Sequence, residues 1–143
     1  MKKLFLLVIV ILLSHNVQAQ KQGIRGKITW SSGNQMPGPD KKSSTTKGIK
    51  RKIFIYEVAT LEQVVQEEGF YKNINTKLVK EAKSCRNGRF RIKLPVGTYS
   101  VFVQESKGLW ANLFDGKGQI NAVQINNSTW TELNMNVNYM AAY

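Results

Sequence analysis

The side chains that could carry out chemistry are few in this sequence. It contains one cysteine, Cys85, and one histidine, His15, which lies close to the end of an apolar N-terminal run. A cysteine nucleophile needs a nearby base, and no histidine follows His15 in the chain. Glu67 and Glu68 are adjacent, so they do not face each other as a pair of catalytic carboxylates must. The inventory of reactive groups therefore predicts a protein that is not an enzyme.

Ligands for a metal ion are equally scarce. One histidine and one cysteine cannot build a zinc-type cluster. The segment Asp115-Gly116-Lys117-Gly118 lacks the repeated oxygen ligands of a calcium loop, and we interpret it as a turn. Cys85 has no second cysteine to pair with, and we predict that it is a half-buried strand residue. We expect no metal and no cofactor.

The N-terminus has the pattern of a secretory signal peptide. Two lysines precede an unbroken apolar run from Leu4 to Leu13, and Val17 and Ala19 place small residues at the cleavage positions. The run has about half of the roughly 20 residues that a membrane-spanning helix needs. We therefore predict a signal peptide over residues 1–19 and one domain over residues 20–143, exported to the periplasm or secreted, without a transmembrane anchor in the mature chain.

The domain is strongly basic. Removing the two lysines of the signal peptide lowers the formal net charge from +12 to +10. Such a charge fits an anionic glycan, an acidic membrane surface or nucleic acid, and it also fits solubility alone. One cluster is a candidate anion-binding site: Lys41, Lys42, Lys47, Lys50, Arg51 and Lys52. No aromatic residues are interleaved there to stack on bases, so nucleic acid is disfavoured as a partner.

Aromatic side chains mark a second candidate surface. Trp110 and Phe114 lie in the glycine-flanked stretch "GLWANLFDGKG", which we interpret as a loop. Exposed aromatic rings there would serve as partner-binding residues. The alternative is that both rings close one end of the domain by packing.

Beyond the signal peptide, apolar residues recur with a period of two, which is typical of strands. Gly23–Trp30 reads as a half-buried strand, and Lys52–Val58 as a central strand covered on both faces. The proline-containing stretch Ser31–Lys50 is expected to be a long loop. Between Thr60 and Gly69 the apolar spacing changes, and with Gln63 placed to complete a capping box we predict a short helix there.

The second half of the chain also alternates. Thr76–Cys85 has a weak apolar face and is expected to be an edge strand. Asn87-Gly88 predicts a type I′ hairpin turn, and Pro95 to Gly97 is expected to join two paired antiparallel strands. The apolar residues of these two strands should share one core: Phe90, Ile92, Leu94, Tyr99, Val101 and Val103. With two more strands near the C-terminus, this organisation predicts an all-β, antiparallel sandwich with one short helix.

Three stretches resemble the carboxypeptidase regulatory-like domains, which have a seven-stranded transthyretin-like (prealbumin-like) sandwich. They are "GIRGKITW", "NGRFRIKLPVGTYSVFV" and "TELNMNV", and the most specific part is Asn87–Val103, with Asn-Gly-x-Phe, Leu-Pro-x-Gly-x-Tyr and Val-x-Val. The chain departs from the family pattern in having Cys85 and Arg86 where an acidic residue often precedes the turn. The loop Ser31–Lys50 and the helix near Leu61 look like insertions, and no peptidase or receptor accompanies the module.

The resemblance implies a non-catalytic module of the kind appended to peptidases or envelope receptors. We therefore expect an exported binding or assembly module of the bacterial envelope, whose partner is another envelope protein or a surface glycan. Two alternatives stay open: a small hydrolase with its site in a transthyretin-like interface, and a binder of anionic polymers through the basic cluster. Whether Trp110, Phe114 and the Lys41 to Lys52 cluster share one exposed surface would discriminate between these possibilities.

Overall fold

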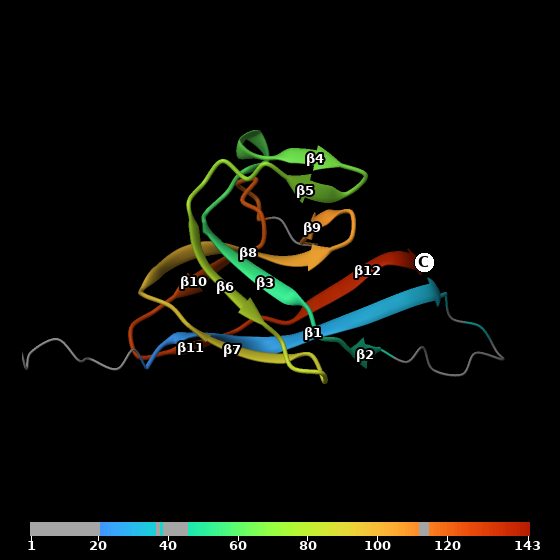
Figure 1. Cartoon of the computed structure of the whole chain (residues 1–143), viewed down its shortest axis with the longest axis horizontal. Coiled ribbons are helices and arrows are strands. Elements are labelled where there is room, and N and C mark those ends of the chain that lie inside the picture. The colour runs from blue at the N-terminus through green and yellow to red at the C-terminus, as the bar shows by residue number, and fades with distance from the viewer. Residues whose placement is uncertain (1–20, 37, 39–45, 112–114) are drawn as a thin grey trace, which may run out of the picture.

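The computed structural model describes residues 21–36, 38, 46–111 and 115–143. The predicted signal peptide, Lys41, Lys42 and Phe114 lie outside the described residues. The described part is all-β, with two mainly antiparallel sheets packed on a shared core (Figure 1). The all-β, sandwich-like architecture expected from the period-two pattern is therefore confirmed.

The first sheet contains five strands: β1 (Gly23–Asn34), β2 (Lys47–Gly48), β7 (Arg89–Lys93), β11 (Trp130–Glu132) and β12 (Met135–Ala142). The second contains seven: β3 (Lys52–Glu57), β4 (Val65–Glu67), β5 (Phe70–Lys72), β6 (Leu78–Lys83), β8 (Gly97–Glu105), β9 (Gly108–Trp110) and β10 (Ala122–Ile125). A 3-10 turn, η1 (Leu61–Gln63), precedes β4. As predicted, β3 is central, between β6 and β8, and β6 is an edge strand.

The first sheet is not wholly antiparallel, because β1 pairs in parallel with β11 and then with β12. The two C-terminal strands form one run that is interrupted beside Gly26. There the Leu133 N–H donates to the Arg25 carbonyl (2.8 Å), and the Lys27 N–H donates to Asn134 Oδ1 (3.0 Å). A Cβ on Gly26 would lie 1.8 Å from the Leu133 carbonyl oxygen, so this close crossing requires glycine.

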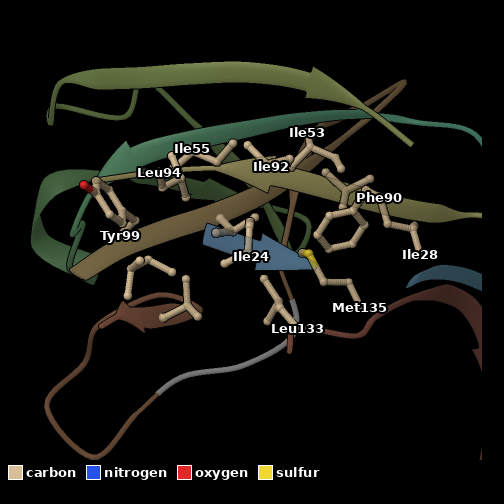
Figure 2. Packing of buried hydrophobic residues seen from close by; sticks show 14 of the residues in the cluster. Ile24, Ile28, Ile53, Ile55, Phe90, Ile92, Leu94, Tyr99, Leu133 and Met135 are labelled. Atoms are coloured by element: carbon tan, nitrogen blue, oxygen red, sulfur yellow. The ribbon is translucent and has the colours of Figure 1, made fainter. Parts of the chain in front are cut away.

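The main core lies between the two sheets. Figure 2 labels some of its side chains: Ile24, Ile28, Ile53, Ile55, Phe90, Ile92, Leu94, Tyr99, Leu133 and Met135. All six residues predicted to share a core on the two sides of the Pro95 corner belong to this cluster. Phe102 lies on the opposite face of β8, in a second, smaller cluster with Tyr71, Ala111 and Ile120.

The strands on either side of Pro95 share this core without pairing, contrary to expectation. β7 pairs with β1, whereas β8 pairs with β3, β9 and β10 in the other sheet. The corner therefore carries the chain from one sheet to the other. The Tyr99 hydroxyl donates to the Pro95 carbonyl (3.0 Å) and ties the start of β8 to the corner.

The predicted type I′ hairpin at Asn87-Gly88 is also wrong. The Gly88 N–H donates to the Cys85 carbonyl (2.9 Å), which makes Arg86 and Asn87 the central residues of the turn, and Gly88 has a positive φ, 84°, whereas Asn87 does not. The turn joins β6 to β7, which belong to different sheets. Cys85 is exposed at this turn rather than half-buried in a strand, because the inward position is taken by Ser84, whose side chain bonds backbone groups at Ile49 and Arg51.

The helix predicted between Thr60 and Gly69 is wrong as well. Only η1 is helical, and the Thr60 N–H donates to Gln63 Oε1 (3.1 Å) as in the expected capping box. The chain then forms the β4–β5 hairpin, which turns at Glu68 and Gly69 with φ of 50° and 84°. Two positive φ values are the mark of a type I′ turn, so this turn occurs here and not at Asn87-Gly88.

Two smaller differences concern the end of β1 and the buried face of β6. β1 continues to Asn34, so the expected loop begins four residues later than predicted, and β2 pairs with β1 inside the same stretch. In β6, Val79 and Ala82 both pack against the core. A strict alternation would put them on opposite faces, and the register shift beside Tyr56 explains the difference.

Candidate functional site

Trp110 is the one predicted aromatic site residue that lies in the described part, and it belongs to strand β9. Its ring is half-buried and lies 5.6 Å from Phe70 and 5.5 Å from Tyr139, centroid to centroid. Its indole N–H donates to the Asn136 carbonyl (3.2 Å). Tyr139 also makes an edge contact with Trp30 at 5.3 Å. This aromatic cluster, Trp30, Phe70, Trp110 and Tyr139, connects the two sheets.

Beside the cluster, the surface forms an open groove of about 610 Å³, which we call the Tyr139 groove. Residues from four separate parts of the chain line it, because β3, β6 and β8 are neighbours in one sheet and β12 crosses beside them. Its acidic and phenolic groups are Glu105 and Tyr139, and its basic groups are Lys50, Arg51, Lys52 and Lys83.

Glu105 is the fixed centre of this groove. Its side chain is 4% exposed, Arg51 Nε lies 2.6 Å from its Oε1, and the Tyr139 hydroxyl donates to its Oε2 (3.0 Å). Arg51 also donates to the Lys50 carbonyl (3.0 Å), which holds the guanidinium in place. Both carboxylate oxygens therefore have partners, as a buried charge requires.

The same contacts perturb the phenol. Burial raises the pKa of Tyr139 above 10.0, and the hydrogen bond to Glu105 and the charge of that carboxylate raise it further. Arg51 and the Ser106 side chain act in the opposite direction. Tyr139 is thus held as a neutral hydrogen-bond donor, and the pair is suited to structure and recognition rather than to proton transfer at neutral pH.

The lysines of the groove are not neutralised within the described part of the chain. Lys52 and Lys83 lie directly opposite each other in the antiparallel β3–β6 ladder, an arrangement in which like charges repel. Ion pairs in the described residues join Arg51 to Glu105, Lys72 to Glu67 and Lys107 to Glu68. None of them uses Lys50, Lys52 or Lys83. These three lysines form a rim of the groove that is chemically suited to an anionic group.

The structure divides the predicted basic cluster. Lys50 and Lys52 are exposed at the Tyr139 groove, whereas Arg51 is engaged by Glu105. Lys47 is exposed on β2, in the other sheet. Trp110 contacts Tyr139, which lines the groove together with Lys50 and Lys52, but Trp110 does not itself line the groove.

Sequence reasoning missed Lys83, Glu105 and Tyr139. Lys83 and Glu105 are the last residues of their strands, and Tyr139 continues the alternation of Met135 and Val137. Nothing in the local sequence shows that the three strands converge. The pairing of β3 with both β6 and β8 brings Lys83 and Glu105 to the same groove. A register prediction would have been needed to find them.

Within residues 21–36, 38, 46–111 and 115–143, no three His, Cys, Asp or Glu side chains group as metal ligands would. Over the same residues, no helix has the length and apolar character needed to cross a membrane.

Comparison with protein-family models, with curated proteins and with solved structures found no match.

Proposed function

We propose that this protein is an exported, non-catalytic binding module of the bacterial envelope, which docks an acidic segment of another envelope protein in the Tyr139 groove. One observation carries the proposal. Lys50, Lys52 and Lys83 take part in none of the ion pairs of the described residues, whereas the Glu105 carboxylate beside them is already paired with Arg51. Lys52 and Lys83 repel each other across the β3–β6 ladder, and a bound acidic group relieves that repulsion. In the adjacent aromatic cluster, Trp30, Trp110 and Tyr139 offer half-buried rings for apolar contact.

The transthyretin-like assignment is part of this proposal. It is supported by the sandwich-like pair of sheets and by the "LPVGTY" corner, which crosses between the sheets and is closed by the Tyr99 hydroxyl. The described strands number twelve rather than seven, and several of the additional ones are only two or three residues long. β2 and β4 fall in the two stretches that look like insertions in the family pattern, and β5 follows directly after the second.

The test is capture of a partner from envelope extract by the immobilised exported protein. The double variant Lys52→Gln, Lys83→Gln removes the opposed charges of the rim and leaves Arg51, Glu105 and Tyr139 untouched. We expect it to lose the captured partner, and capture by the native protein to weaken with salt, because exposed charges are screened.

A matched control removes the same charge elsewhere. Lys77 and Lys117 are exposed and do not line the groove, and Lys77→Gln, Lys117→Gln should retain the partner. Unchanged capture by the Lys52, Lys83 variant, or equal loss in both variants, would overturn the assignment of the groove.

A further inference from the structure

A second concentration of positive charge lies on the outer face of the five-stranded sheet. β1 and β7 run antiparallel and side by side (Figure 1), with Arg25 opposite Arg91 and Lys27 opposite Arg89. All four side chains are exposed. Directly opposite residues point to the same side of a sheet, with Cβ atoms about 4.5–5.5 Å apart. We call these four residues the cationic face.

The charges of the cationic face are not balanced in the described part of the chain. None of the four side chains takes part in the ion pairs found there. Glu132 lies beside Arg25 in the β1–β11 register and is the acidic residue that lines the same cleft, yet no ion pair within 4.0 Å joins them. Two like-charged cross-strand pairs in succession cost stability, so an anionic occupant would relieve a real repulsion.

The face is also shaped to receive a ligand. The four side chains line a cleft of about 590 Å³, together with Cys85, Phe90 and Asn134. The Arg91 guanidinium lies over the Trp130 ring, 4.0 Å from its centroid. This cation–π contact restricts a side chain that would otherwise be free to move in solvent.

We propose that the cationic face binds a linear glycan that carries phosphate or sulfate groups, with each cross-strand pair holding one oxyanion. The planar guanidinium presents a fork of N–H donors that matches tetrahedral oxyanions, and every pair contains at least one arginine. The two pairs are two residues apart, which corresponds to about 7 Å along a strand. The fitting ligand therefore has oxyanions with about that spacing.

The surroundings favour a polymer chain over a lipid surface or nucleic acid. None of the large apolar side chains exposed in the described residues lines this cleft, so a membrane would find no group to insert beside the charges. The indole of Trp130 is covered by Arg91 and is not a free platform for a base. This site lies on the sheet opposite β3 and β6, and it does not depend on the function proposed for the Tyr139 groove.

The experiment is calorimetric titration of the exported protein with a sulfated dextran oligomer and, separately, with inorganic tripolyphosphate. Neutral dextran and orthophosphate serve as the uncharged and single-anion probes. Both multivalent anions should bind more tightly than orthophosphate, neutral dextran should not bind, and the affinity should fall steeply as salt is raised. Tighter binding of sulfated dextran than of tripolyphosphate identifies the sugar chain as part of the ligand.

Substitutions locate the site. Arg25→Gln together with Arg91→Gln should weaken binding by tenfold or more, roughly the loss of one charge-assisted hydrogen bond. Arg25→Lys with Arg91→Lys should weaken it less, because charge is kept and bidentate geometry is lost. The control Lys77→Gln, Lys117→Gln should bind as the native protein does.

A stability measurement supplies an independent readout. Arg89→Gln removes one member of a like-charged pair without touching the Arg91–Trp130 contact, so it should raise the thermal unfolding midpoint at low salt while weakening binding. The proposal is overturned by equal loss of binding in the charge-matched control, by a lower midpoint for Arg89→Gln, or by stronger binding to anionic lipid vesicles or single-stranded DNA than to the sulfated oligomer.

Discussion

Gly88 illustrates how much of this fold rests on single positions. Its φ is 84°, a region that L side chains rarely adopt, and a Cβ there would lie 2.1 Å from the Ile28 carbonyl oxygen. That oxygen also accepts a hydrogen bond from the Ile49 N–H (3.1 Å). Local sequence predicted a tight turn at this glycine, and the reason that glycine is obligatory comes from β1, a distant strand.

Gly88→Ala should lower the free energy of unfolding by at least about 2 kcal/mol, because backbone strain adds to displacement of the Ile28 carbonyl. Gly116→Ala is the matched control, since a Cβ at Gly116 meets no atom within 4 Å. Its effect should be close to zero. Urea denaturation of both variants measures the difference, and similar losses in the two would contradict the close approach at Gly88.

Residue types alone identified part of the candidate site. Lys50 and Lys52 were predicted from their clustering, and Trp110 from its glycine-flanked segment. Glu105 and Tyr139 were not predictable, because an acidic residue at the end of one strand and a tyrosine near the C-terminus are ordinary on their own. Their significance lies in the 3.0 Å hydrogen bond that joins them.

At the scale of elements, the helix predicted near Leu61 shows why a short apolar spacing misleads. Leu61 and Val65 are 45% and 49% exposed, so the spacing that suggested a buried helical stripe buries little. Phe70 and Tyr71, at 2% and 1% exposure, are buried by pairing as a hairpin against β9. Tertiary burial of two aromatic residues therefore outweighs the local helix signal.

The period-two alternation predicted the buried residues of β7 and β8 correctly, whereas the helical spacing near Leu61 predicted the wrong element. A period of two assigns each side chain to a face whether or not the two strands pair, so the core residues were predictable and the pairing was not. Strand partners depend on long-range contacts, as the crossing of the chain at Pro95 shows.

Phe90→Ala should test this facing assignment. The ring is 6% exposed within the main core, and its removal should cost about 3–4 kcal/mol through lost burial and a residual cavity. Arg89→Ala, one residue away on the exposed face, should change stability by less than about 0.5 kcal/mol. Chemical denaturation gives both values, and equal effects would mean that the β7 faces are reversed.

At the scale of the whole molecule, charge and burial are segregated. The acidic side chain of Glu105 is drawn into the structure by Arg51, while the lysines of the groove and the four residues of the cationic face remain exposed. Composition predicted the excess of positive charge, but only the register of β1 with β7 and of β3 with β6 concentrates it at two places. The two proposed surfaces follow from that concentration.

Tyrosine burial gives the whole molecule a characteristic response to alkaline pH. Burial is the largest cause raising the pKa values of Tyr56, Tyr71, Tyr99 and Tyr139 above 10.0. Below pH 10 these phenols are neutral in both the folded and the unfolded chain, so their contribution to stability is fully present. As pH rises beyond 10, the unfolded chain ionises first, and the folded state loses stability.

Tyr71→Phe isolates one of these groups, since desolvation by burial is the cause that raises its pKa. We expect the free energy of unfolding of the native protein to fall more steeply above pH 10 than that of the variant. Lysines titrate in the same range, but they do so in both proteins and cancel in the difference. Denaturant unfolding from pH 8 to pH 11 measures how the free energy of unfolding changes with pH. A steeper decline of that free energy in Tyr71→Phe than in the native protein would contradict the prediction, because it would mean that the buried phenol ionises more readily in the folded chain than in the unfolded one.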